Sequence, residues 1–489
     1  MMIRLSNTIL FFCLILVLNS TCTTRPGQPD QEQQELTTPN VLFIAIDDLR
    51  PELNVYGAHH IKSPSIDKLA SQSLTFERAY CNVPVCGASR ASLMSGVRPG
   101  RYRFIGYSTY LDEDYPGVTS LPQLFHENGY RTISNGKIYH HRDDDADAWD
   151  EIWGPGHRNQ SPRAYINPEN VHLDTMKGSR GYPYEKADVA DTAYQDGKIA
   201  AKAIEDLKKL KEEGEPFFLA VGFKKPHLPF LAPAKYWNLY DSTQISLPDN
   251  YKQPESTPDI AFHNFGELRH YSGIPKTGPV SSAMASKLIH GYYASTSFTD
   301  AQIGKVLSAL EELELDQNTI VILWGDHGWN LGDHQMWCKH CNFESSLHVP
   351  MILKVPGQTS GQKTKAIVEY IDIYPTLAEL ANLELPEHLD GESLVSLLNG
   401  GDSNKKYAVS KFHDGITLIE GNLFYTEWLD QDQNVKARML FDHATDSLEL
   451  NNLAEKPEYQ QKVEELSQKL HSRWGDDFFV DRRKQEAVN

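Results

Sequence analysis

Two pairs of adjacent residues in this chain offer the side chains that could bind a hard metal ion. Asp47 is followed directly by Asp48, and Asp326 is followed by His327. Adjacent carboxylates repel one another unless a cation lies between them, and carboxylate oxygens are ligands that calcium and magnesium prefer. One aspartate could instead cap the N-terminus of a helix. Two adjacent aspartates together with a third favour a metal site, in which His327 would be the less usual ligand for calcium.

Lysine and histidine side chains in two further segments could bind an anion and move protons. Lys137 and His140 are separated by two residues, and His227 directly follows Pro226. Lysine is a compact cation that suits the oxygens of an anion, and histidine exchanges protons near neutral pH. The rigid backbone beside His227 suits a single fixed proton transfer. Ordinary surface side chains are the alternative for these residues, and His141 competes with His140 for the proton-transfer role.

A third segment places a cysteine four residues before an arginine. It reads Cys86-Gly-Ala-Ser-Arg90 and continues with Ala-Ser-Leu-Met-Ser-Gly96. A cysteine that is merely buried at the start of a helix is the alternative, because free cysteine is often buried. The chain has 6 cysteines, too few for a disulfide scaffold. Cys338 and Cys341 lack a second pair at zinc spacing, which favours a structural disulfide or free thiols there.

Polar clusters follow four apolar, β-branched runs, and this order predicts the fold. The runs are residues 41–46, 130–134, 216–222 and 319–324. Helical patterns lie between them, at residues 65–73, 119–127, 190–213 and 285–313. Short continuous apolar runs are typical of strands buried on both faces, so the alternation predicts an α/β fold with a large, mixed, mostly parallel sheet between layers of helices. Ligands bind at the carboxyl ends of the strands in such sheets, where we expect the four clusters to converge.

The N-terminus has the pattern of an export signal. Arg4 precedes an apolar run at residues 9–18 that is too short to span a bilayer and suits a signal peptide. We therefore predict a signal peptide over residues 1–22. Cys22 would be the lipidated first residue of a lipoprotein, and plain cleavage nearby without lipidation is the alternative. Residues 23–37 are polar and contain proline, which predicts a disordered tether.

The rest of the 489 residues suffices for one large domain and a smaller one. We place the large domain at residues 38–400 and a C-terminal subdomain at residues 401–489. The subdomain has short strand-like pieces at residues 407–410, 423–428 and 438–441. With an amphipathic stretch at residues 457–474, these pieces predict a small antiparallel sheet and one helix. The net charge of −19 argues against binding to nucleic acid or anionic membranes. If the substrate is an anion, the positive charge that binds it must be concentrated in a pocket.

The segment at residues 86–96 resembles the signature of the type I, formylglycine-dependent sulfatases of the alkaline-phosphatase superfamily. That signature is Cys-x-Pro/Ala-Ser-Arg followed by an apolar pair and glycine, and Ala88 stands here where proline is usual. Other segments that resemble the family are residues 40–50, 136–140, 224–229, 326–334, 349–357 and 441–454. The Asp326-His327 pair resembles the Asp-His pair found at this position in the iduronate-2-sulfatase branch. The resemblance runs from about residue 38 to the end and implies an alkaline-phosphatase-like fold, with residues 38–400 as the catalytic domain.

The resemblance also implies two cofactors. A separate formylglycine-generating enzyme or anaerobic maturase would oxidise Cys86 to formylglycine (3-oxoalanine). The hydrate of that aldehyde offers two hydroxyls, of which one attacks sulfur and the other later expels the sulfate; a serine would stay sulfated. One Ca²⁺ per chain would be held by the modified Cys86 together with Asp47, Asp48, Asp326 and His327.

The remaining roles follow from the same resemblance. Arg90 and the metal would polarise the aldehyde hydrate. Lys137 and Lys339 would bind the sulfate oxygens, which is electrostatic stabilisation by positioned charges. His227 would protonate the departing sugar oxygen, and His140 would take the proton from the remaining hydroxyl. Catalysis would thus be covalent and proceed in two steps, while His334 and His340 are expected to be structural.

The branch implies a sulfated polysaccharide or its oligosaccharides as substrate. The sugar would be a 2-O-sulfated uronic acid, iduronate or glucuronate, or a similar sugar in glycosaminoglycan or ulvan-type algal polysaccharide. With the export signal, this indicates an enzyme of the periplasm or cell envelope. One alternative is a phosphoester or phosphonate monoester hydrolase of the same superfamily, against which the paired Lys137 and Lys339 argue. The other is an inactive carbohydrate-binding relative, against which the presence of Cys86 and His227 argues.

Overall fold

The computed structural model describes residues 38–156, 161–358, 361–432 and 434–479, with side chains described as far as residue 472. The predicted signal peptide at residues 1–22, with Cys22, and the predicted tether at residues 23–37 lie outside the described residues. Within the described ranges, no helix is both long enough and apolar enough to cross a membrane.

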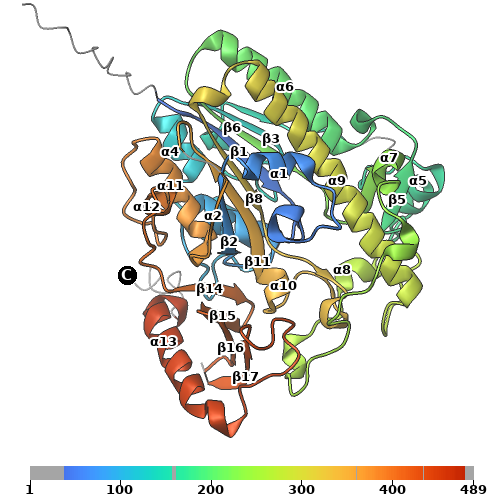
Figure 1. The fold of residues 1–489 in the computed structure, drawn as a ribbon, viewed down its shortest axis with the longest axis vertical. Helices are drawn as coiled ribbons and strands as arrows, with labels where there is room; N and C mark the ends of the chain where they lie inside the picture. The colour runs from blue at the N-terminus through green and yellow to red at the C-terminus, as the bar shows by residue number, and fades with distance from the viewer. Residues whose placement is uncertain (1–37, 157–160, 359–360, 433, 480–489) are drawn as a thin grey trace, which may run out of the picture. The chain divides into compact units, whose positions relative to one another are not determined.

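A mixed sheet forms the centre of the structure (Figure 1), with the strand order β12-β2-β11-β8-β1-β6-β3-β4 and with β13 beside β2. Its strands are β1 (Asn40–Ile46), β2 (Leu74–Tyr80), β3 (Arg131–Gly136), β4 (Glu151–Trp153), β6 (Phe217–Phe223), β8 (Thr319–Gly325), β11 (His348–Lys354), β12 (Gln362–Thr364) and β13 (Val368–Glu369). The neighbours β8, β1, β6, β3 and β4 are parallel, whereas β11 runs antiparallel to β8 and β2. The predicted mixed, mostly parallel sheet is confirmed, and each of the four predicted apolar runs is one of its strands.

Helices cover both faces of this sheet. Alternate residues of β1 point to opposite faces, because successive side chains of a strand alternate. Leu42, Ile44 and Ile46 pack with α1 (Pro64–Ala70), α6 (Gln195–Glu213) and α9 (Ser282–Glu312). Their neighbours Val41, Phe43 and Ala45 pack with α2 (Cys86–Ser95), α4 (Leu121–Glu127) and α11 (Ile373–Leu380). Every residue of β1 is buried, so its apolar run comes from having two covered faces.

Shorter elements complete the main part of the chain. The helices are α3 (Leu111–Asp114), α5 (Pro168–Thr175), α7 (Ala234–Trp237), α8 (Gly266–Arg269), α10 (Glu344–Leu347) and α12 (Val395–Leu398). Two small sheets pair β5 (Tyr184–Ala187) with β7 (Phe230–Pro233) and β9 (Asn330–Leu331) with β10 (Trp337–Cys338).

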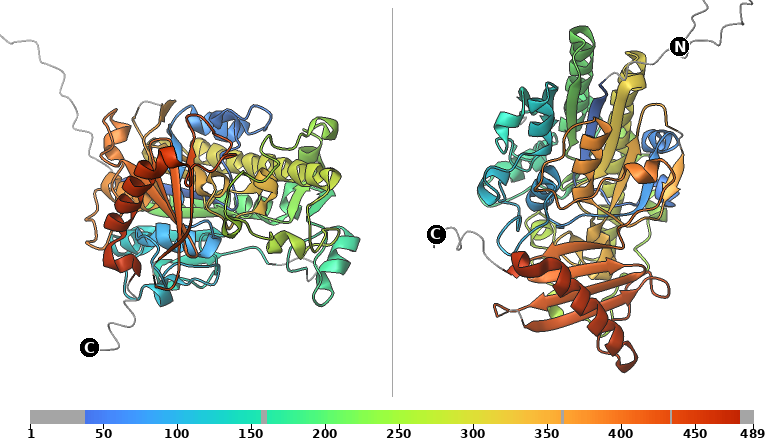
Figure 2. Two further views of the ribbon diagram at one scale, coloured as in Figure 1. Left: turned by 90° about the horizontal axis from the view of Figure 1, so that it is seen from below. Right: turned by 90° about the vertical axis from the view of Figure 1, so that its left-hand side faces the viewer.

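The C-terminal region is an antiparallel sheet with one helix across it (Figure 2). The strands are β14 (Tyr407–Phe412), β15 (Gly415–Glu420), β16 (Leu423–Leu429) and β17 (Val435–Asp442), and the helix is α13 (Gln460–Phe479). Val463, Leu466 and Leu470 of the helix pack on one side of the sheet. On the other side Ile419 and Phe424 join an apolar cluster with Tyr80 and Phe343 of the main part. The predicted antiparallel sheet and helix are confirmed, but β15 was not among the predicted strands.

Candidate active site

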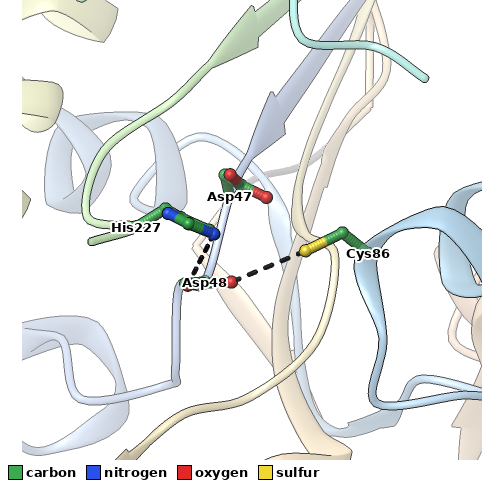
Figure 3. Close-up of side chains that lie close together, drawn as sticks. All are labelled: Asp47, Asp48, Cys86 and His227. Atoms are coloured by element: carbon green, nitrogen blue, oxygen red, sulfur yellow. Dashed lines mark hydrogen bonds and ion pairs between the residues drawn. The ribbon is translucent and has the colours of Figure 1, made fainter. Parts of the chain in front are cut away.

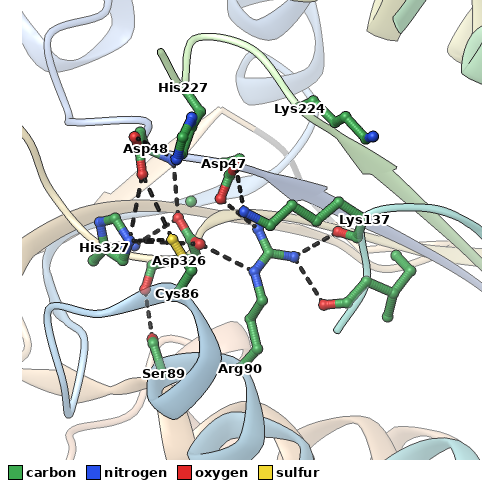
Figure 4. Close-up of polar contacts among 12 residues, drawn as sticks. Asp47, Asp48, Cys86, Ser89, Arg90, Lys137, Lys224, His227, Asp326 and His327 are labelled. Atoms are coloured by element: carbon green, nitrogen blue, oxygen red, sulfur yellow. Dashed lines mark hydrogen bonds and ion pairs between the residues drawn. The ribbon is translucent and has the colours of Figure 1, made fainter. Parts of the chain in front are cut away.

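The four predicted polar clusters meet at one edge of the sheet (Figure 4). Asp47 and Asp48 follow β1, Lys137 follows β3, His227 follows β6 and Asp326 follows β8. These strands are neighbours in the order β8-β1-β6-β3 and are parallel, so their carboxyl ends lie together. The helix α2 begins at Cys86 and brings the cysteine to the same place.

Glycines allow two of these strand ends to approach closely. A Cβ on Gly136, which has φ 84°, would lie 2.2 Å from the carbonyl oxygen of Gly222. A Cβ on Gly222 would lie 2.1 Å from the carbonyl oxygen of Lys137. Because real Cβ atoms cannot come that close, any other residue at either position would push β3 and β6 apart. The approach therefore fixes Lys137 beside the end of β1.

Three buried carboxylates form the centre of the site, and each has a cationic partner. Lys137 Nζ lies 2.6 Å from Asp47 Oδ2, and Lys339 Nζ lies 3.2 Å from each oxygen of Asp48. Burial opposes ionisation of Asp47, but Lys137 and other nearby cations hold the pKa of that carboxyl well below its usual range. Burial raises the pKa of Asp48 to about 7. The cluster thus concentrates negative charge that only nearby cations can stabilise.

Arg90 forms ion pairs with two of the carboxylates. Its Nη2 lies 3.2 Å from Asp47 Oδ1, and its Nε lies 3.0 Å from Asp326 Oδ2. Its Nη1 donates hydrogen bonds to the carbonyl oxygens of Lys137 and Ile138, at 2.5 and 2.8 Å. The side chain is 0% exposed. Arg90 therefore acts as a fixed internal cation that sets the positions of the ends of β1, β3 and β8.

The donor groups around this centre suit a divalent cation. One ligand atom from each of Asp48, Cys86, Asp326 and His327 lies within 4.8 Å of the others. A second such group, which includes Asp47, is drawn in Figure 3. His327 Nδ1 lies 2.9 Å from the carbonyl oxygen of Gly328, to which it donates in the neutral ring, and this leaves the Nε2 lone pair facing the cluster. Buried carboxylate oxygens with one imidazole nitrogen fit the predicted metal site.

Cys86 faces the same centre. Its Sγ lies 3.1 Å from His327 Nε2 and 3.9 Å from Asp48 Oδ1. Burial raises the pKa of the Cys86 thiol to about 12. The thiolate is the reactive form of cysteine, so an unmodified Cys86 would be a poor nucleophile at neutral pH.

His227 and Lys339 meet at a residue that the sequence analysis missed, Glu267. Glu267 Oε1 lies 3.1 Å from His227 Nε2, and Oε2 lies 3.0 Å from Lys339 Nζ. His227 Nε2 also lies 3.7 Å from Asp48 Oδ2, which places the imidazole at the rim of the cluster. Glu267 stands in no recognisable motif and lies 40 positions from His227 and 72 from Lys339, so its role could be found only from the tertiary structure.

His140 lies near the cluster but contacts it less directly. Its Nδ1 is buried and has no hydrogen-bond partner among the described residues, and its ring lies 6.2 Å from that of Tyr107. Burial, followed by the nearby charge of Lys137, lowers the pKa of His140 to about 2, so the ring is neutral and its protonation is disfavoured in this environment. The competing His141 stacks on Tyr110 at 4.1 Å. His140 is thus distinguished from His141 by a buried ring nitrogen that has no partner among the described residues, whereas His141 is stacked on Tyr110.

The remaining histidines and cysteines named from the sequence contact other parts of the fold. His334 Nε2 lies 3.6 Å from Glu449 Oε2 in the C-terminal region, and His340 stacks on Phe412 of β14. Cys338 and Cys341 are buried free thiols. Of the two alternatives for that pair, the structure therefore has the free thiols.

Comparison with known proteins identifies the family. Residues 39–383 match the family model described as Sulfatase. The chain belongs to the sulfatase family. It is therefore a sulfuric ester hydrolase, as the resemblance predicted. The sulfatase is 34% identical to iduronate 2-sulfatase of Homo sapiens over 415 residues, which cover 76% of this chain and 74% of that protein. It is 28% identical to an ulvan-active sulfatase of Formosa agariphila, with 92% of this chain and 84% of that protein covered.

Solved structures share the fold of this sulfatase. The phosphonate monoester hydrolase of Silicibacter pomeroyi aligns with a TM-score of 0.74 and 22% identity, covering 90% of this chain and 96% of that chain. A 2-O GAG sulfatase aligns with a TM-score of 0.69 and 24% identity, covering 89% and 92%. At these identities the likeness shows the fold alone, and it confirms the alkaline-phosphatase-like architecture.

Proposed function

We propose that this sulfatase removes sulfate from a sugar of a sulfated polysaccharide or of its oligosaccharides, at the cluster around Cys86. The observation that carries the proposal is the convergence of three buried aspartates, two lysines and a partly buried histidine on one cysteine. The relatives named iduronate 2-sulfatase and ulvan-active sulfatase support a 2-O-sulfated uronic acid or a similar sugar as the substrate.

We assign one Ca²⁺ to this site, held by Asp47, Asp48, Asp326, His327 and the modified Cys86. When bound there, the ion would supply positive charge beside the sulfate and the nucleophile. Formylglycine made from Cys86 would supply, as its hydrate, the attacking hydroxyl. The Cys86-Gly-Ala-Ser-Arg90 segment and the position of Cys86 Sγ among the candidate metal ligands support this modification.

The other side chains have positions that suit binding and proton transfer. The ammonium group of Lys137 pairs with Asp47, and that of Lys339 pairs with Asp48. We assign both to the sulfate oxygens. His227 would give the proton at Nε2 to the leaving sugar oxygen. His140 would accept a proton at Nδ1, which is buried and has no partner among the described residues.

The test is a parallel assay on sulfate and phosphate chemistry. Purified, matured enzyme would be given oligosaccharides that carry sulfate at the 2-position of a uronic acid or at other positions. A phosphate monoester and a phosphonate monoester with the same leaving group would be assayed beside them. We expect release of sulfate, fastest from the 2-O-sulfated uronic acid. Faster cleavage of the phosphate or phosphonate ester would favour the alternative function, and binding without turnover would favour an inactive relative.

Maturation and location form a second part of the proposal. We propose that a separate formylglycine-generating enzyme or anaerobic maturase modifies Cys86, and that the protein is exported to the periplasm or cell envelope. The apolar run at residues 9–18 supports export. Fractionation of cells that express the full chain and its Cys22→Ser variant tests this. A membrane-bound wild type and a released variant would indicate a lipid anchor, equal release of both would indicate plain cleavage, and retention of both in the cytoplasm would contradict export.

A further inference from the structure

Glu267 contacts two residues with different predicted tasks in the reaction. We propose that Glu267 is a positioning residue, which holds the proton donor His227 and the sulfate-binding Lys339 at a fixed separation. The inference rests on the proposed function, because it takes the roles of His227 and Lys339 from there. Glu267 belongs to the short helix α8.

The carboxylate of Glu267 forms a bridge. One oxygen lies 3.1 Å from His227 Nε2, and the other lies 3.0 Å from Lys339 Nζ. Both partners also lie near the same indole, since the ring of Trp329 is 6.4 Å from the His227 ring and 5.0 Å from Lys339 Nζ. The second nitrogen of His227, Nδ1, is occupied by a backbone carbonyl oxygen at 2.5 Å. The imidazole is thus held from both sides, with Glu267 on the side that faces the cluster.

The backbone that carries Glu267 is anchored in the core. Phe265, Leu268 and Tyr271 are buried and belong to the main apolar cluster. The side chain of Glu267 is 18% exposed, far less than a free surface glutamate. Although burial opposes ionisation, Lys339 and His227 keep the pKa of the Glu267 carboxyl well below its usual range. The residue is therefore a rigidly placed anion rather than a mobile surface acid.

The bridge matters because both partners have a second acceptor. Lys339 Nζ lies 3.2 Å from Asp48, and His227 Nε2 lies 3.7 Å from the same residue. Without Glu267, both side chains would keep only their contacts with Asp48 at the centre of the cluster. His227 would then no longer be held in its present orientation, and Lys339 would lose one of its two carboxylate partners. A small displacement of a catalytic group is enough to lower the rate strongly.

The experiment uses the variants Glu267→Ala and Glu267→Gln of the matured enzyme. The amide of glutamine can accept a hydrogen bond from one partner but presents its NH₂ group to the other. Values of kcat and KM would be measured on a sulfated sugar, whose alkoxide needs a proton to leave, and on an activated aryl sulfate, which hardly needs it. Asp259→Asn is the matched control, because Asp259 is an exposed carboxylate in the same stretch of chain.

We expect Glu267→Ala to raise KM for both esters through Lys339 and to lower kcat for the sugar ester through His227. The fall in kcat should be ~10-fold larger on the sugar ester than on the aryl sulfate, a part of the ~10²–10⁴-fold that a general acid supplies. Glu267→Gln should lie between alanine and wild type, and Asp259→Asn should match wild type. A double-mutant cycle with His227→Ala needs only the sugar ester: once His227 is gone, the effect of Glu267→Ala on kcat should disappear.

Two results would overturn the proposal. One is wild-type kcat and KM in both Glu267 variants. The other is a loss of kcat on the sugar ester that stays the same when His227 is already replaced, because that loss would come from a general effect on the fold. Failure of the proposed function is a separate result, because it would show as wild-type enzyme that releases no sulfate from any ester.

Discussion

Replacement of Arg90 should reveal how much the site depends on its internal cation. Arg90→Met keeps the apolar stem and removes the guanidinium, which leaves Asp47 and Asp326 without their shared partner and two carbonyl oxygens without a donor. Loss of one partner of a buried ion pair costs ~3–5 kcal/mol, and an unsatisfied buried carbonyl costs ~1–3 kcal/mol more. These costs overlap because the groups form one network. We therefore expect a loss of at least ~3–5 kcal/mol.

The loss can be read as a shift in melting temperature. The unfolding entropy is ~2.1 cal/mol/K per residue, so a domain of ~450 residues loses roughly 1 °C per kcal/mol, and Arg90→Met should melt ~3–5 °C lower. Thermal unfolding would be followed by tryptophan fluorescence at one scan rate, in the presence of a chelator so that metal does not neutralise the carboxylates. Arg90→Lys keeps the charge but cannot bridge both carboxylates, and it should fall between Arg90→Met and wild type.

Arg131 provides the matched control. It pairs with Asp150 at 3.1 Å, but its side chain is 28% exposed. Exposed ion pairs contribute ~0–1 kcal/mol, so Arg131→Met should shift the melting temperature by less than ~1 °C on the same scale. A melting temperature of Arg90→Met within that range of wild type, or equal melting temperatures of the two methionine variants, would refute the role of Arg90 as an internal cation.

Three further perturbations test other parts of the site. A chelator should abolish sulfatase activity and calcium should restore it best; restoration by zinc alone would contradict the hard-ligand assignment. His227→Ala should lose ~10²–10⁴-fold on a sulfated sugar and much less on an activated aryl sulfate, whereas His140→Ala should slow both esters equally; the reverse pattern would exchange their roles. Although burial opposes ionisation, hydrogen bonds from His334 and His443 lower the pKa of Glu449 to about 2 from its ordinary 4.5. The ionised carboxylate therefore stabilises the fold above pH 4.5, and this stabilisation is lost as the pH falls towards 2. Glu449→Gln should flatten the acid side of the plot of unfolding free energy against pH, and superimposable plots for variant and wild type would refute this.

The sheet was predictable because its central strands are covered on both faces. The run at residues 41–46 is apolar throughout, as a strand between two helical layers must be, and it became β1. The strand β15, in contrast, was not predicted. Only two residues separate it from β14, and His413 between them adopts φ 47°. The Asp-Gly pair at residues 414–415 is a known signal for a tight hairpin, so this strand could have been predicted from the sequence.

The candidate site was predictable where a residue follows a strand, and not where its role depends on tertiary contacts. Asp47, Asp48 and Asp326 stand directly after β1 and β8, so the parallel topology alone brings them together. Lys339 was found only through the family resemblance. Glu267 has no motif, and its contacts with Lys339 and His227 come from the packing of a short helix that no local pattern encodes.

In the proposed reaction, Cys86 is converted into the group that attacks the sulfate ester. The most direct test is the mass of the peptide that contains residue 86, measured on active protein, together with the activity of Cys86→Ala. We predict an aldehyde at residue 86 in part or all of the molecules, and a folded Cys86→Ala protein that releases no sulfate from a 2-O-sulfated sugar. An unmodified thiol in fully active enzyme, or full activity in Cys86→Ala, would contradict the claim.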